Sequence, residues 1–97
     1  MKSILQSDKV CYRCGKNGYG DPLDKHHAFG GALRGKAERY GLWVYLCHCA
    51  CHEFGPESVH QDRESRLEVQ QAAQRAAMRE YGWTTEDFIR EFGRNYI

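Results

Sequence analysis

Five cysteines in a chain of 97 residues constrain this protein more than any other feature. A chain this short builds a small hydrophobic core and often needs a disulfide or a metal ion to stabilise it. The cysteine count is odd, and no apolar run follows the first residues, so a secreted disulfide framework is not indicated. Paired cysteines outside that context indicate a metal site, and we expect a cytoplasmic protein.

The cysteine spacing predicts a structural zinc ion held by four thiolates: Cys11, Cys14, Cys47 and Cys51. Two residues between the first two thiolates let both reach one ion at about 2.3 Å, and three residues between the last two are also within the zinc range. Two alternatives stay open, because Cys49 or His48 can replace one of these ligands. A redox role for the C-x₂-C pair lacks the βαβ pattern that usually surrounds such a motif.

Four histidines lie near the same segments: His26, His27, His52 and His60. One histidine would usually be an ordinary core residue, but four near a short strand and a helix start indicate a functional site. Adjacent residues of a strand point to opposite faces, so His26 and His27 cannot both bind one metal from a regular strand. One of them can bind a metal while the other serves as a general base.

The charge balance limits how this chain could contact nucleic acid. The net charge is +1, which is not the strongly basic balance of a protein that coats nucleic acid. Any such contact needs a local patch, and Arg34, Lys36 and Arg39 form one candidate after Gly30–Gly31. The alternative interpretation is a solvated face without a ligand. The longest apolar run, LWVYL, is too short to span a bilayer, so we expect no membrane contact.

Hydrophobic periodicity predicts an α+β fold. We expect strands over residues 24–29 and 42–46, with a short helix between them that stops at Gly41. A long helix should begin at Ser58 or Asp62 and end at Gly82. A further helix, capped by Thr84 or Thr85 and ended by Gly93, should bury one apolar side: Phe88, Ile89 and Phe92.

The order of these motifs resembles the HNH (ββα-metal) endonucleases. The C-x₂-C knuckle, the His26-His27 pair, the Gly-Gly loop, an apolar strand ending in Leu-Cys, then Cys-His and a later histidine carry the resemblance, from Cys11 to about His60. The carboxyl-terminal FIREFGRNYI and the spacing of the last histidines are similar to small phage-encoded HNH proteins, including the RecA-dependent nuclease group. The resemblance implies one HNH-like domain over residues 1–97, with a zinc-stapled ββα-metal core over 10–61 and a helical extension of two helices over 62–97.

The resemblance also implies an activity, the hydrolysis of DNA phosphodiester bonds by a metal-dependent endonuclease. His27 matches the general base, and three residues match ligands of the catalytic divalent ion (Mg²⁺, Mn²⁺, Ni²⁺ or Zn²⁺): His26, His52 and His60. The basic cluster Arg34, Lys36 and Arg39 would hold backbone phosphates. The implied setting is the cytoplasm of a bacterial host, as a monomer or homodimer, with DNA and recombination or packaging proteins of phage or host as partners.

The chain departs from the family pattern at two places. In many members the last two histidines are four residues apart on one helix, whereas here Gly55-Pro56 lies within an eight-residue separation. The helix should therefore start late, near His60, with His52 reaching in from a loop. Gly41-Leu42 stands where Asn-Leu is common. The near-neutral net charge and the missing Asn favour an alternative, a catalytically inactive HNH-like zinc-binding interaction module, for example an inhibitor of a host system. The intact His26-His27 pair favours the endonuclease more strongly.

Overall fold

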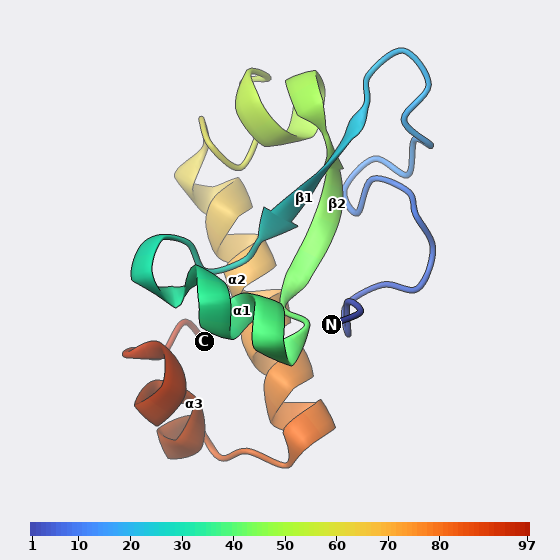
Figure 1. Ribbon diagram of the computed structural model, residues 1–97. Coiled ribbons are helices and arrows are strands. Elements are labelled where there is room, and N and C mark those ends of the chain that lie inside the picture. The colour runs from blue at the N-terminus through green and yellow to red at the C-terminus, as the bar shows by residue number, and fades with distance from the viewer.

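The structure is a computed structural model that describes residues 1–97, with strands and helices in an α+β arrangement (Figure 1). Its elements are β1 (Leu23–His27), the 3₁₀ turn η1 (Gly31–Leu33), α1 (Arg34–Tyr40), β2 (Trp43–Cys47), the π-helical turn η2 (His48–Glu53), α2 (Arg63–Tyr81) and α3 (Thr85–Phe92). Figure 1 shows the sheet beside α2, with η2 at one end of the strands and α1 at the other. No helix has the length and apolar character needed to cross a membrane.

The two strands pair antiparallel, with His26 opposite Val44 and His27 opposite Trp43. Alternation along each strand gives the sheet two distinct faces. Val44 and Leu46 lie on the face toward α2, and both are fully buried. Trp43 lies on the other face, where its indole N–H donates to the carbonyl oxygen of Met1 at 3.0 Å. The residues before the cysteine knuckle therefore contact Trp43 on this face and backbone groups along the outer edge of β2.

The long helix begins and ends at residues that suit helix termini. Asp62 precedes α2, and its carboxylate accepts a hydrogen bond from the backbone N–H of Ser65 at 3.0 Å. Gly82 ends the helix with a φ of 66°, a left-handed conformation that favours glycine. The helix therefore begins at Arg63, slightly later than a start near His60, and both late histidines precede it.

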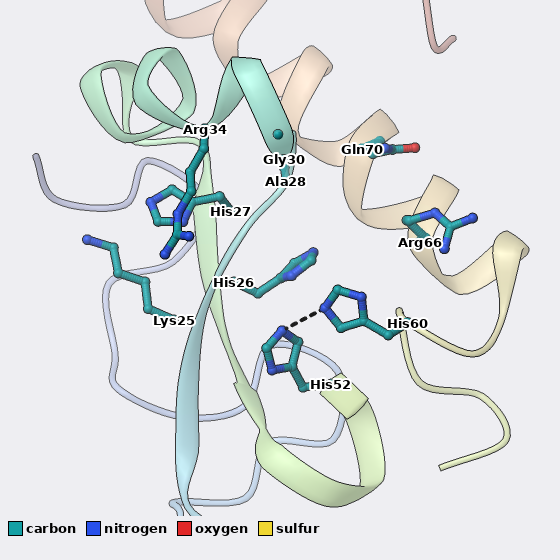
Figure 2. Close-up of a pocket in the computed structure, with 11 residues that line it drawn as sticks. Lys25, His26, His27, Ala28, Gly30, Arg34, His52, His60, Arg66 and Gln70 are labelled. Atoms are coloured by element: carbon teal, nitrogen blue, oxygen red, sulfur yellow. Dashed lines mark hydrogen bonds between the residues drawn. The ribbon is translucent and has the colours of Figure 1, made fainter. Parts of the chain in front are cut away.

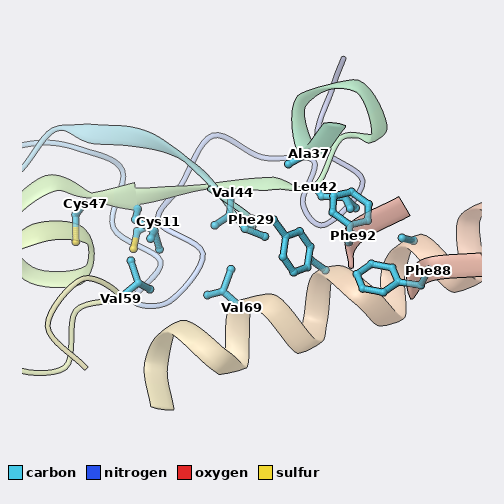
Figure 3. Packing of buried hydrophobic residues seen from close by; sticks show 14 residues of the cluster. Cys11, Phe29, Ala37, Leu42, Val44, Cys47, Val59, Val69, Phe88 and Phe92 are labelled. Atoms are coloured by element: carbon cyan, nitrogen blue, oxygen red, sulfur yellow. The ribbon is translucent and has the colours of Figure 1, made fainter. Parts of the chain in front are cut away.

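One hydrophobic core joins the sheet to the helices that follow it (Figure 3). Phe29, just after β1, packs against Phe88 and Phe92 of α3 with ring centroids 5.6 Å and 4.8 Å away. Ile89 is 37 % exposed, so the prediction that it is buried is wrong. Phe88 and Phe92 are four residues apart and define the inner face, whereas the next residue along the helix is turned by about 100°.

Candidate metal centres

Four cysteines converge at the end of the sheet near η2: Cys11, Cys14, Cys47 and Cys51. Their sulfur atoms lie within 4.8 Å of one another, and Cys14 Sγ is 3.7 Å from Cys47 Sγ. A tetrahedral zinc ion with Zn–S bonds of about 2.3 Å places its sulfur ligands about 3.8 Å apart. The cysteine cluster therefore has the spacing needed to hold a zinc ion.

Thiol ionisation within the cysteine cluster also suits a bound cation. Burial opposes ionisation of Cys11, but backbone hydrogen bonds, first among them that of Cys14, lower its pKa to about 6. Burial raises the pKa of Cys47 to about 11, and burial together with the neighbouring cysteine thiols raises the pKa of Cys51. Four neighbouring thiolates repel one another, so a divalent cation is what allows all of them to ionise.

The polypeptide brings the cysteine cluster together from three segments. The backbone N–H of Tyr12 donates to the Tyr45 carbonyl at 2.8 Å, which ties the knuckle to β2. Cys47 ends β2, and Cys51 lies one turn later on η2. The two alternative ligands lie outside the cluster: Cys49 is exposed, and Nδ1 of His48 is 2.6 Å from a carboxylate oxygen of Asp24.

Three histidines form a second candidate metal centre (Figure 2): His26 of β1, His52 of η2 and His60 of the following loop. One nitrogen of each ring lies within 4.8 Å of the others. The Nε2 atoms of His52 and His60 are 3.1 Å apart, and the His26 ring centroid lies 5.1 Å from that of His52. The structure thus brings together all three residues that the sequence predicts as ligands of one ion.

The protonation of the histidine triad, His26, His52 and His60, fits a divalent metal. Nε2 of His26 is buried without a hydrogen-bond partner, and burial together with the nearby His52 lowers the His26 pKa to about 3. His26 is therefore neutral, the form that binds metals. Nδ1 of His52 is the nitrogen bonded to Asp24, at 2.8 Å, so a neutral His52 turns the unshared electron pair of Nε2 toward the triad. Unshared electron pairs can thus converge on one cation.

A tight loop carries His60 back to His52 across Gly55-Pro56. The backbone N–H groups of Val59 and His60 donate to the carbonyl oxygens of Cys51 and His52, at 2.9 Å and 3.2 Å. Gly55 allows this return, because a Cβ atom there would lie 2.1 Å from the Ala50 carbonyl oxygen. The eight-residue separation is therefore spanned by backbone hydrogen bonds, and no single helix has to carry both histidines.

His27 occupies the opposite side of β1 from the histidine triad, as strand alternation predicts (Figure 2). Its Nε2 lies 2.9 Å from Oε1 of Glu38 on α1. The hydrogen bond from Lys25, and to a lesser extent that from His27, lowers the pKa of Glu38 to about 2. This carboxylate is therefore ionised and can only accept hydrogen bonds. Nε2 of His27 is therefore the donor, and a neutral His27 carries its free electron pair on Nδ1.

One recess of about 340 Å³ lies beside β1, and both His27 and the histidine triad line it. Arg34 lines it, as do two residues of α2, Arg66 and Gln70. Lys36 does not, because its Nζ donates to the carbonyl of Glu91 on α3 at 2.9 Å. Arg39 lies outside the recess as well. Of the three predicted phosphate-binding residues, the structure places only Arg34 beside the histidines.

Sequence reasoning missed three polar residues around these centres: Asp24, Glu38 and Arg66. Asp24 is two residues before His26, and period-two alternation along a strand would have placed both on one face. Glu38 and Arg66 carry no such signal, because α1 and α2 are placed against β1 only by tertiary packing.

The chain was compared with protein-family models, curated proteins and solved structures. No family model, curated protein or solved structure matches it.

Proposed function

We propose that this protein is a metal-dependent DNA endonuclease of the HNH (ββα-metal) type. One observation carries the proposal: three histidine nitrogens converge on one side of β1, while His27 lines the same recess from the other side of the strand and has its Nε2 bonded to Glu38. This pairing of a metal site with a separate neutral imidazole is the combination that phosphodiester hydrolysis uses. A module that only binds zinc would have no use for it.

In the proposed reaction, Nδ1 of His27 removes a proton from a water molecule. The oxygen of that water forms a bond to phosphorus, and the bond from phosphorus to the 3′ oxygen breaks. The leaving oxygen takes a proton from solvent, so the products end in a 5′-phosphate and a 3′-hydroxyl. Glu38 accepts a hydrogen bond from Nε2 of His27 and thereby leaves Nδ1 as the basic nitrogen of the neutral ring.

The histidine triad would hold the divalent ion, which supplies Lewis-acid stabilisation of the negative charge that develops on the scissile phosphate. Asp24 fixes the ring of His52 through Nδ1, and the loop hydrogen bonds fix His60. Ligands held in this way need little rearrangement when the ion binds.

Arg34 and Arg66 supply positive charge in the lining of the recess that a phosphate backbone would enter. Neither residue forms a salt bridge with a carboxylate. Arginine suits this task because its planar group can donate two parallel hydrogen bonds to one phosphate. Such contacts give affinity and orientation without sequence specificity.

A plasmid-nicking assay with Mg²⁺, Mn²⁺ or Ni²⁺ tests the proposal. We expect the wild type to nick supercoiled DNA, and His27→Ala to be slower by about 100- to 10,000-fold, since the base is lost while the metal ligands remain. His27→Ala should keep the wild-type zinc content and unfold in one cooperative transition, which would show that it is folded. If a folded, zinc-loaded wild type cleaves no DNA with any of these ions, the proposal is wrong and the inactive zinc-binding module is the better account.

A further inference from the structure

A second recess, of about 320 Å³, adjoins the first and takes no part in the proposed chemistry. Three arginines line it: Arg63, Arg66 and Arg94. Arg66 and Gln70 line both recesses, so the two hollows lie on either side of this pair of α2 residues. Figure 2 shows both side chains projecting from the same side of α2.

The structure holds Arg94 in place although it lies close to the carboxyl terminus. Gln74, fully buried in α2, accepts a hydrogen bond from the backbone N–H of Tyr96 at 2.7 Å, and Gln71 donates to the Tyr96 carbonyl at 2.8 Å. The Tyr96 ring packs on Phe29 with centroids 4.9 Å apart, and the Arg94 guanidinium lies 4.6 Å from the centroid of that ring. Buried side chains therefore fix the position of this cation beside α2.

The charges of the second recess are unbalanced. No carboxylate lines it, and none of its three arginines forms a salt bridge within the chain. Gathering three guanidinium groups is electrostatically unfavourable unless an anion joins them. Arginine clusters of this kind bind phosphate groups through charge-assisted, often paired hydrogen bonds.

We infer that the second recess binds the nucleic-acid backbone, at phosphates that follow the scissile one along the same strand. The inference rests on the proposed function for the path of the substrate, which runs from the histidine triad over Arg66 and Gln70 to Arg63 and Arg94. Because these contacts reach phosphates and no base edges, they add affinity that depends on salt and not on sequence.

Binding of a fluorescent DNA duplex, followed by anisotropy without added divalent ion, tests this inference independently of cleavage. The test variant is Arg63→Gln/Arg94→Gln. The matched control is Arg75→Gln/Arg79→Gln, which removes two exposed arginines of the same helix that line neither recess. We expect the test variant to bind at least about tenfold more weakly and the slope of log K against log salt to fall by about 2, because two phosphate contacts are lost.

The control variant should bind within about twofold of wild type at the same salt concentration. Equal binding by the two double variants, or no binding of DNA by the wild type, overturns the inference. If Arg63→Gln/Arg94→Gln is unfolded by circular dichroism, the single charge reversal Arg94→Glu replaces it, with Arg79→Glu as its control. Arginine-dependent binding without cleavage would refute only the endonuclease, whereas cleavage with arginine-independent binding would refute only this recess.

Discussion

The backbone N–H of His60 donates to the carbonyl oxygen of His52 at 3.2 Å, and the Nε2 atoms of the two rings lie 3.1 Å apart. Two residues separated by Gly55-Pro56 are thus placed side by side by the main chain itself. This arrangement gives the histidine triad a geometry that does not depend on a continuous helix. Alterations to the loop should therefore change the geometry of the triad.

Gly55→Ala should weaken the histidine site. The added Cβ would overlap the Ala50 carbonyl, so the loop must shift and carry His60 with it. We expect a loss of about 1–3 kcal/mol in stability and about tenfold weaker Mn²⁺ binding by calorimetry. Gly35→Ala is the control, since that helical glycine has open space around it and alanine there should stabilise by up to about 1 kcal/mol. Unchanged Mn²⁺ affinity in Gly55→Ala would show that the loop does not set the site.

Removal of one thiolate should abolish zinc binding at the cysteine cluster and destabilise the fold. Wild type should contain about one zinc ion per chain by elemental analysis, and Cys14→Ser should lose it. The unfolding midpoint should fall by roughly 15 °C or more, since each 1 kcal/mol is worth about 4–8 °C in a domain of this size. Cys49→Ser should leave both quantities unchanged, because Cys49 is exposed and outside the cluster. Zinc retention by Cys14→Ser would contradict the four-cysteine site.

Asp24→Asn should loosen the divalent ion without unfolding the protein. The carboxylate orients His52 by accepting its Nδ1 proton, and an amide does so less firmly and without the charge. We expect divalent-metal affinity to fall by about 10- to 100-fold in titration calorimetry. Asp8→Asn is the control, because the Asp8 side chain is exposed and far from the triad in sequence. Equal metal affinity in the two variants would exclude a positioning role for Asp24.

The carboxylate of Glu38 should make stability depend on pH in the acid range. Its pKa is lowered from 4.5 to about 2 in the folded protein, so its stabilising contribution is complete above about 4.5 and is lost as the pH falls toward 2. Between pH 5 and pH 2, wild type should therefore lose more stability in urea unfolding than Glu38→Gln does. Zinc release at low pH affects both proteins and cancels in the comparison. Glu64→Gln, which alters an exposed carboxylate, should follow wild type.

Local patterns in the sequence predict the order of the strands and helices and the cysteine ligands, whereas the resemblance to the HNH endonucleases supplied the histidine ligands. LWVYL predicts β2 from its apolar and aromatic residues, and Gly41 and Gly82 end helices where the pattern places them. The cysteine spacing predicts the cluster because the knuckle is a local motif and β2 leads directly into η2. Strand alternation alone separates His26 from His27.

What the sequence leaves undetermined depends on contacts between distant segments. Lys36 binds Glu91, 55 residues away, so no local pattern could show that it is turned from the recess. The placement of Arg66 beside the histidines requires the packing of α2 on the sheet, which involves most of the core. The return of His60 depends on close approach at Gly55, and a Gly-Pro pair indicates a turn without giving its direction.

Anomalous scattering from a crystal grown with Mn²⁺ would show directly whether the histidine triad binds a divalent ion. We expect two separate metal positions. Zinc should lie among the four cysteine sulfurs, and manganese should lie within bonding distance of His26, His52 and His60, on the opposite side of β1 from His27. Manganese absent from the triad, or bound only at the cysteines, would contradict a catalytic metal centre in this protein.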